Sequence, residues 1–307
     1  MKVTDLHGML DLQKLYGIAA FAPIPLSECV INKPYLLDRA GLPSDGRGSA
    51  LPFLLPYYTA GGEGGNVSMY AVAEDYHRYC ASLFEDMVGR LSALSPGGRF
   101  AGFADHAPIF EVDAAAKAGL GFYGDNGLLI SREYSSFVFI GGIYTDADAD
   151  AWHTLVSGAN VRGSFEPEHC PGCGMCRSSC PAGAIGERTP EGRGHIDRER
   201  CLSAVTQKKK LTAEDEDAVA GAEYVWGCDV CQLVCPFTKA ARAAGTLETP
   251  LSYFKEKLIK TLDEKTLCEL IKAGTFGTRA FAWRGEGVAL RNLHLKEGKK
   301  DKNDNKN

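Results

Sequence analysis

The stretch 170–181, CPGCGMCRSSCP, contains four cysteines spaced C-x2-C-x2-C-x3-C, with a proline directly after the last. In bacterial ferredoxins this spacing lets three thiolates hold one 4Fe–4S cluster, while the fourth cysteine serves a second cluster. A four-thiolate zinc site is the alternative, but zinc ribbons use two separated C-x2-C pairs. The stretch therefore favours iron–sulfur ligation over zinc.

A second group of cysteines, Cys228, Cys231 and Cys235, precedes Pro236, and the single Cys201 lies upstream of it. Cys201 can supply the member that this group lacks, which brings the ligand count to eight and predicts two 4Fe–4S clusters. In two-cluster ferredoxins the last cysteine of each group ligates the cluster of the other group. The expected sets are Cys170, Cys173, Cys176 and Cys235 for one cluster, and Cys180, Cys201, Cys228 and Cys231 for the other.

The composition is that of an ordinary globular protein: 307 residues, of which 45% are hydrophobic and 24% charged. The formal net charge of −5 argues against a surface built throughout to bind phosphates. The chain has no apolar run of membrane-spanning length, and its start, MKVTDLHGML, lacks the pattern of a secretory signal. No membrane association and a cytoplasmic location are therefore expected, and eleven cysteines in that compartment favour metal over disulfides.

Three regions and a tail follow one another along the chain. Residues 1–150 alternate strand-like and helical apolar patterns, which predicts an α/β domain. Residues 151–248 are rich in Cys, Pro and Gly, which predicts a double-cluster domain with short elements. Residues 249–295 return to helical spacing and are expected to pack back on the core, whereas residues 296–307, KEGKKDKNDNKN, are expected to be disordered.

Within the first region, apolar spacing and turn residues predict individual elements. Helices are expected over 6–17, 74–94 and 109–119, and strands over 18–24, 50–58, 99–105 and 137–144. The strand that ends at Asp105 and the helix that Gly119 closes enclose the segment HAP, residues 106–108.

Several segments, in order and spacing, resemble the epoxyqueuosine reductases. In the cysteine-rich region these are CPGCGMCRSSCPAGAI at 170–185, IDRERCLSAVT at 196–206 and GCDVCQLVCPF at 227–237. Upstream are AEDYH at 73–77, FADHAPIFEVDAAAKAGLGFYGDNGLLIS at 103–131 and FVFIGGIYTD at 137–146, and downstream is GTFGTRAFAWRGEGVALRN at 274–292. The resemblance covers most of residues 45–292.

The resemblance implies a nitroreductase-like α/β domain that binds cobalamin, followed by a bacterial-ferredoxin-like two-cluster domain. In that family, which is related to reductive dehalogenases, the clusters pass electrons to cobalamin, and epoxyqueuosine in tRNA is reduced to queuosine. The clusters in turn need an external donor of the ferredoxin or flavodoxin type. The resemblance thus implies an oxidoreductase of queuosine biosynthesis.

The resemblance also implies site residues. Asp105 matches the position of the family's general acid, which supplies the proton as the C–O bond breaks. On the residues alone, an N-cap for the following helix is the favoured interpretation of Asp105, and the resemblance is what favours the acid. Asn126 and Ser203 match segments that line the corrinoid, and Asp105 is expected to contact it as well, whereas His106 is expected to have a structural role.

Three departures from the family pattern bear on the substrate. Asp125 stands where the family has lysine, Met69 where it has arginine, and Ala73 where it has glycine. The lost positive charge puts tRNA in doubt, and the lysine run at 207–212 is balanced by the acidic AEDED that follows. Two alternatives stay open: a corrinoid iron–sulfur reductase that acts on a small molecule or a partner corrinoid protein, and a non-catalytic two-cluster electron carrier.

Overall fold

The computed structural model describes residues 9–157, 169–189 and 194–304, and the chain divides into two compact units. The sheet unit comprises Met1–Pro56, His77–Tyr123 and Leu129–Cys170. The cysteine unit comprises Tyr57–Tyr76, Gly124–Leu128 and Pro171–Asn307. Each unit is therefore assembled from separate parts of the chain, whereas the composition suggested consecutive domains.

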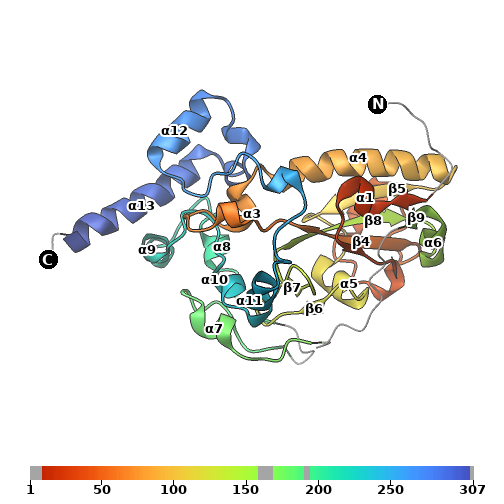
Figure 1. Cartoon of the computed structure of the whole chain (residues 1–307), viewed down its shortest axis with the longest axis horizontal. Coiled ribbons are helices and arrows are strands. Elements are labelled where there is room, and N and C mark those ends of the chain that lie inside the picture. Colours follow the sequence, from red (N-terminus) through yellow and green to blue (C-terminus); the bar gives the residue numbers. More distant parts are fainter. Residues whose placement is uncertain (1–8, 158–168, 190–193, 305–307) are drawn as a thin grey trace. The chain divides into compact units, whose positions relative to one another are not determined.

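The sheet unit contains a five-stranded antiparallel sheet, in the order β2-β4-β8-β5, with β3 also paired to β4 (Figure 1). Its strands are β2 (Ala20–Phe21), β3 (Ile24–Pro25), β4 (Ser49–Pro56), β5 (Phe100–Ala104) and β8 (Val138–Thr145). All eight residues of the central strand β4 are buried, which agrees with its continuous apolar sequence. The sheet thus forms the core of this unit.

Two helices cover opposite faces of this sheet (Figure 1). On one face, Phe84 of α4 (Tyr76–Leu94) packs against Phe53 of β4, with ring centroids 6.2 Å apart. On the other face, Ala114 of α5 (Glu111–Lys117) belongs to the same buried cluster as Ala50 of β4. Residues 50 and 53 can serve different faces because side chains alternate along a strand.

The remaining elements of the sheet unit are short. They are β1 (Leu10–Asp11), α1 (Leu12–Tyr16), α2 (Pro34–Arg39), β6 (Phe122–Tyr123), β7 (Leu129–Ile130), α6 (Trp152–Leu155) and β9 (Val156–Ser157), with 3-10 turns at Leu26–Glu28 and Ala149–Ala151. The helix expected over 6–17 is therefore only α1 in the described part of the chain, and Gly17, in the left-handed conformation with φ of 61°, ends it.

The cysteine unit consists of helices joined by loops. They are α3 (Met69–Val72), α7 (Met175–Ser179), α8 (Leu202–Val205), α9 (Ala213–Gly221), α10 (Val230–Leu233), α11 (Pro236–Ala243), α12 (Glu264–Lys272) and α13 (Glu286–Asp304), with 3-10 turns at Ala60–Gly62, Ser252–Phe254, Phe276–Thr278 and Ala280–Ala282. The short elements near the cysteines agree with the prediction from composition.

Two side-chain amides hold distant parts of the cysteine unit together. Asn66 donates from Nδ2 to the Leu262 carbonyl at 2.8 Å and accepts the Leu262 N–H at 2.7 Å. Asn292 of α13 is fully buried and donates to the carbonyls of Thr206 and Val225 at 2.8 and 2.9 Å. The bonds of Asn66 place the segment 57–76 with the C-terminal half of the chain, which sequence proximity does not predict.

The C-terminal region differs from the sequence expectation. Residues 296–304, expected to be disordered, continue α13 as far as Asp304. Extending an existing helix adds one backbone hydrogen bond per residue, and Lys and Glu are good helix formers, so the helix continues without apolar side chains. Residues 305–307 lie outside the described residues. Within the described ranges, the helices are too short or too polar for any of them to cross a membrane.

Candidate functional site

One cavity of the cysteine unit gathers the four cysteines predicted for one of the two clusters. Cys180, Cys201, Cys228 and Cys231 line it. The rest of the lining is mostly apolar, with Ile185, Ile196 and Val230 among its residues. Thiolates in an apolar enclosure are the donor set that a 4Fe–4S cluster requires, so these residues fit that group.

The local fold explains how these four cysteines meet. Cys180 ends α7, Cys201 is the N-cap of α8, and Cys231 lies in α10. The Ala184 N–H donates to Cys180 Sγ at 3.3 Å. Such N–H donation to sulfur is one of the means by which a protein adjusts the reduction potential of an iron–sulfur cluster.

Burial raises the pKa of two thiols in this cavity, Cys228 and Cys231, so these two ionise at neutral pH only when a cation binds them. The pKa of Cys228 is raised to about 12, mainly by burial, and the nearby Asp229, Cys201 and Cys180 contribute to the increase. Metal ligation requires thiolates and therefore releases protons when the metal binds. Within 9–157, 169–189 and 194–304, no group of three or more His, Cys, Asp or Glu side chains is arranged to hold a single metal ion.

In the other predicted set, Cys176 lies in α7, which packs against α10, and Cys235 follows α10 as the N-cap of α11. Cys173 is exposed, and Cys176, Cys235 and Cys170 are partly exposed. Gly172 and Gly174, on either side of Cys173, have φ of 71° and 74°. That left-handed conformation is the one for which glycine is preferred, and it lets the chain turn tightly between the cysteines.

Asn126 lies in the cavity that the cysteines line, and it is 6% exposed. Its Oδ1 accepts the Leu128 N–H at 3.3 Å. Ser203 lies in α8 and its carbonyl accepts a hydrogen bond from Gln207 Nε2 at 2.6 Å. Asn126 is thus placed beside a proposed cluster, and a contact of either residue with a corrinoid stays a prediction.

The negative charge of Asp125 is neutralised within the cysteine unit. Asp125 is buried and accepts a hydrogen bond from Nε of Arg188, with which it forms an ion pair. Arg188 is 63 residues away in sequence, and no motif predicts the pairing. The Asp125 carboxylate and the Arg188 guanidinium therefore carry no net charge as a pair.

Asp229, between two of the cysteines, is a buried residue that the motif did not single out. Its carboxylate accepts hydrogen bonds from Ser68 Oγ at 2.6 Å, the Met69 N–H at 2.6 Å and Gln232 Nε2 at 3.1 Å. These bonds fasten the second cysteine group to the start of α3. Met69 stands where the family has arginine, and its backbone N–H is bound by the Asp229 carboxylate.

In the sheet unit, Asp105 follows β5 with the backbone in the left-handed conformation, φ 61°. This conformation is uncommon for a residue other than glycine, and Asp is among those that tolerate it best. The N-cap of α5 is Phe110, so Asp105 does not cap that helix. Its side chain is 68% exposed, and its Oδ2 lies 3.6 Å from Nε2 of His77.

Glu111, the first residue of α5, holds this conformation of Asp105. Glu111 Oε1 accepts the Asp105 N–H at 3.0 Å. Burial, together with the negative charge of Asp105, raises the pKa of Glu111 from 4.5 to about 8. The sequence did not single out Glu111, because a glutamate in the first turn of a helix is common.

Replacing Glu111 by glutamine should weaken the pH dependence of stability. The folded protein keeps the Glu111 proton up to about pH 8, whereas the unfolded chain releases it near pH 4.5. The free energy of unfolding should therefore fall as pH rises between these values. Between pH 4.5 and 8, the thermal midpoint of the wild type should fall by about 2–4 °C more than that of Glu111→Gln. This difference corresponds to about 1 kcal/mol in the free energy of unfolding, after allowing for solvent screening.

The control for this measurement is Glu85→Gln, which removes an exposed glutamate of α4. This variant should keep the pH dependence of the wild type. Equal pH dependence of the wild type and Glu111→Gln would show that the pKa of the Glu111 carboxyl is not raised by folding.

His106, next to Asp105, has two partners that suit a structural role. Its Nδ1 lies 3.3 Å from Lys33 Nζ, and its Nε2 lies 3.1 Å from the Tyr35 hydroxyl. Both ring nitrogens are thus within hydrogen-bond distance of side chains of the sheet unit.

Comparison with known proteins supports both the fold and the clusters. Residues 169–238 match the 4Fe-4S double cluster binding domain family. An epoxyqueuosine reductase from Burkholderia pseudomallei (strain K96243) is 33% identical over 229 residues, which are 74% of this chain and 51% of that protein. The chain thus spans about half the length of this curated relative.

Solved structures have the same fold. The epoxyqueuosine reductase from Streptococcus thermophilus has a TM-score of 0.67 at 20% identity, covering 94% of this chain and 80% of its own. An epoxyqueuosine reductase with a tRNA-Tyr epoxyqueuosine-modified stem loop has a TM-score of 0.63 at 20% identity, covering 91% of this chain and 77% of its own. The predicted fold class, α/β with a double-cluster domain, is confirmed.

Proposed function

Because this chain is a relative of the epoxyqueuosine reductases, we propose that it is an iron–sulfur, cobalamin-dependent oxidoreductase that reduces epoxyqueuosine in tRNA to queuosine. The observation that carries the proposal is the cavity lined by Cys180, Cys201, Cys228 and Cys231. These cysteines come from three separate parts of the sequence, yet they line one enclosure together. A cubane cluster needs such a set of four thiolates.

The cysteines are assigned to two clusters by the ferredoxin rule that the last cysteine of each group ligates the cluster of the other group. The cavity supports the set Cys180, Cys201, Cys228 and Cys231. The remaining set is Cys170, Cys173, Cys176 and Cys235, for which the spacing and the packing of α7 against α10 are the support.

The overall reaction removes the epoxide oxygen as water, which consumes two electrons and two protons. Two clusters that each carry one electron can supply this pair, and an external donor of the ferredoxin or flavodoxin type would reload them. Cobalamin, when bound, would supply the redox-active cobalt at the substrate. The exposed carboxylate of Asp105 and the exposed ring of Phe110, five residues later, suit an amphipathic ligand of this kind.

Asp105 is assigned as the general acid. Its carboxyl group is exposed, so a substrate can reach it, and the Glu111 contact fixes its backbone. His77, at 3.6 Å, is the group from which Asp105 can recover a proton after each turnover. A bound substrate and corrin ring would also bury the carboxyl, which favours its protonated form.

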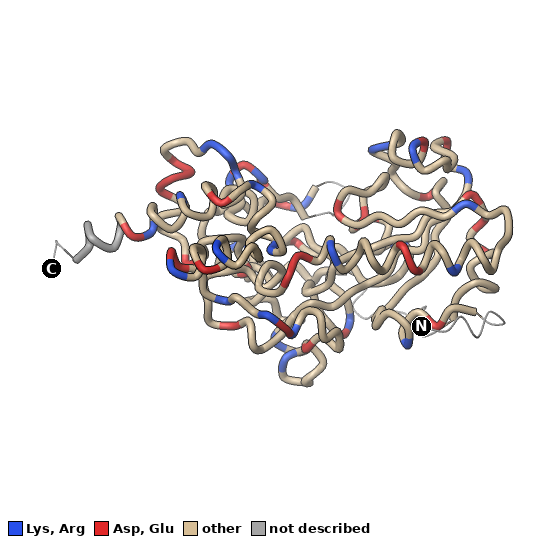
Figure 2. Tube along the Cα trace, turned by 90° about the horizontal axis from the view of Figure 1, so that it is seen from above, with Lys and Arg blue, Asp and Glu red and all other residues tan. Residues whose placement is uncertain are grey.

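The tRNA substrate rests on the relatives, one of which has been solved with an epoxyqueuosine-modified tRNA stem loop. Figure 2 shows Lys and Arg interspersed with Asp and Glu along the described trace. RNA binding would therefore depend on local groups such as Lys209 and Lys210, which are exposed, rather than on a uniformly basic surface. We place the reaction in the cytoplasm, where thiols are kept reduced and available for cluster ligation.

The test is conversion of epoxyqueuosine-modified tRNA by the anaerobically reconstituted protein, with a chemical reductant and with or without cobalamin. Mass spectrometry of the digested tRNA should show queuosine only when cobalamin is present. The free epoxyqueuosine nucleoside is the parallel substrate. Reduction of the nucleoside but not of the tRNA would favour a small-molecule reductase, and reduction of neither would refute the proposed activity.

A further inference from the structure

Cys201 differs from the other seven proposed ligands because no cysteine motif fixes its position. Its nearest cysteine neighbours in sequence are Cys180 and Cys228, each more than twenty residues away. It is the N-cap of α8, and its N–H donates to the Asp197 carbonyl at 2.9 Å. The geometry of the loop 197–201 therefore decides where the Cys201 thiolate lies.

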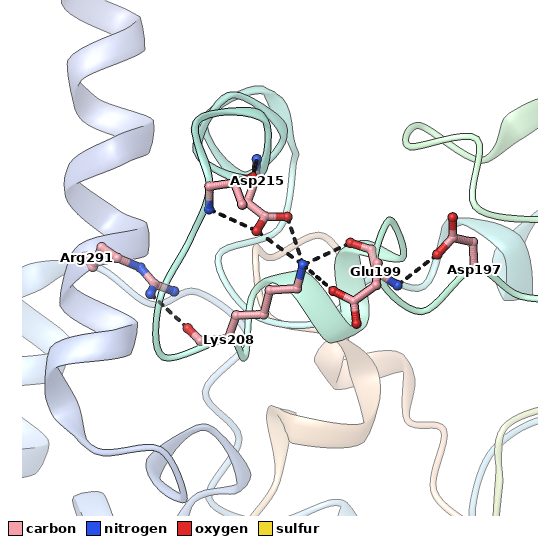
Figure 3. Close-up of polar contacts among 6 residues, drawn as sticks. Asp197, Glu199, Lys208, Asp215 and Arg291 are labelled. Atoms are coloured by element: carbon pink, nitrogen blue, oxygen red, sulfur yellow. Dashed lines mark hydrogen bonds and ion pairs between the residues drawn. The ribbon is translucent and has the colours of Figure 1, made fainter.

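Lys208 holds this loop from the far end of α8 (Figure 3). Its Nζ donates to the Glu199 carbonyl at 3.1 Å and forms an ion pair with the Glu199 carboxylate at 3.0 Å. The Glu199 N–H donates in turn to Asp197 Oδ1 at 2.9 Å, which tightens the turn before Cys201. One side chain thus contacts the backbone two residues before the ligand.

Lys208 is itself held by two further elements (Figure 3). Asp215 accepts from its Nζ at 3.0 and 3.2 Å, and Asp215 also forms the capping box of α9 with Thr212. Arg291 of α13 donates to the Lys208 carbonyl at 2.8 Å. Asp215 is 8% exposed and the Lys208 side chain 24%, so water screens this pair less than it screens an ordinary surface pair.

These contacts also distinguish Lys208 from the two lysines that follow it. Lys208 points into the network with Glu199 and Asp215, whereas Lys209 and Lys210 are exposed. The first lysine of the run therefore has a structural partner set that the other two do not share.

We propose that Lys208 is a positioning residue that fixes Cys201 for ligation of its cluster. The inference rests on the proposed ligand role of Cys201. It assigns Lys208 no contact with substrate or cluster: the side chain acts through the backbone of the loop 197–201. Groups that orient metal ligands in this way commonly change metal affinity by about 10–100-fold when they are removed.

The test compares Lys208→Met with Lys208→Arg and with Lys209→Met, all as anaerobically reconstituted full-length protein. The iron chelated per chain over time should be biphasic for Lys208→Met, with about four of eight irons released about 10-fold faster than in the wild type. Lys209→Met should release iron like the wild type, and Lys208→Arg should restore most of the retention because it keeps the charge and donors. The electron paramagnetic resonance signal of only one reduced cluster should change.

Two results would overturn the inference. Release from Lys208→Met that matches the wild type would show that the network does not position Cys201. Equal acceleration for both clusters, together with loss of helical circular dichroism, would show that Lys208 only stabilises the unit. A Cys201→Ser variant that keeps both clusters would instead reject the ligand role of Cys201, which separates failure of the proposed function from failure of this inference.

Discussion

Replacing Asp105 by asparagine should reduce the turnover of epoxyqueuosine-modified tRNA by about 10²–10⁴-fold, the usual contribution of a positioned general acid. The amide has the size of the carboxyl group but cannot donate a proton to the departing oxygen. Asparagine also tolerates the left-handed conformation found at this position, φ 61°, so the local backbone should persist. Turnover is measured by mass spectrometry of the digested tRNA.

The matched control is Asp38→Asn, which changes an exposed aspartate of α2 in the same unit. This variant should retain wild-type turnover. Iron content and the spectral change on adding cobalamin should be unaltered in Asp105→Asn. The defect of this variant would then lie in proton transfer. Equal turnover of the wild type and Asp105→Asn would exclude Asp105 as the acid.

Replacing Cys201 by serine should lower the iron content from about eight to about four atoms per chain. Cys201 lines the cavity with Cys180, Cys228 and Cys231, and a neutral hydroxyl is a poor replacement for a thiolate on iron. The remaining set of cysteines contains a complete group of three with Cys235, so its cluster should form. Turnover should be lost because the electron path is interrupted.

The control for this variant is Cys268→Ser, which removes an exposed cysteine of α12 outside both predicted sets. It should retain about eight irons. If Cys201→Ser also retained about eight, Cys201 would not be a ligand, and the crossed assignment of the eight cysteines would need another member.

The proposed cysteine ligands are the part of the site on which the sequence is most specific, because the spacing of such ligands follows from cluster geometry. The pattern even predicted that Cys180 and Cys201 serve the same cluster, and the structure places both in one cavity. The helix α4 and the strand β8 could also be predicted from the sequence, since their apolar residues recur at the expected spacing.

The contacts that tune the site could not be predicted, because they join residues with no shared motif. Arg188 neutralises Asp125 across 63 positions of sequence. The role of Glu111 depends on the left-handed backbone of Asp105. The residues alone favoured Asp105 as the N-cap of the following helix, which is wrong because Phe110 is the N-cap of α5. The grouping of residues 57–76 with the cysteine unit likewise depends on long-range bonds such as those of Asn66.

The most direct test of the central claim is the metal content and visible spectrum of the protein purified without oxygen, before and after cobalamin is added. We expect about eight irons per chain, the broad brown absorption of cubane clusters, and a change in the cobalamin spectrum on mixing. One or two zinc ions per chain, a colourless protein and an unchanged cobalamin spectrum would contradict it.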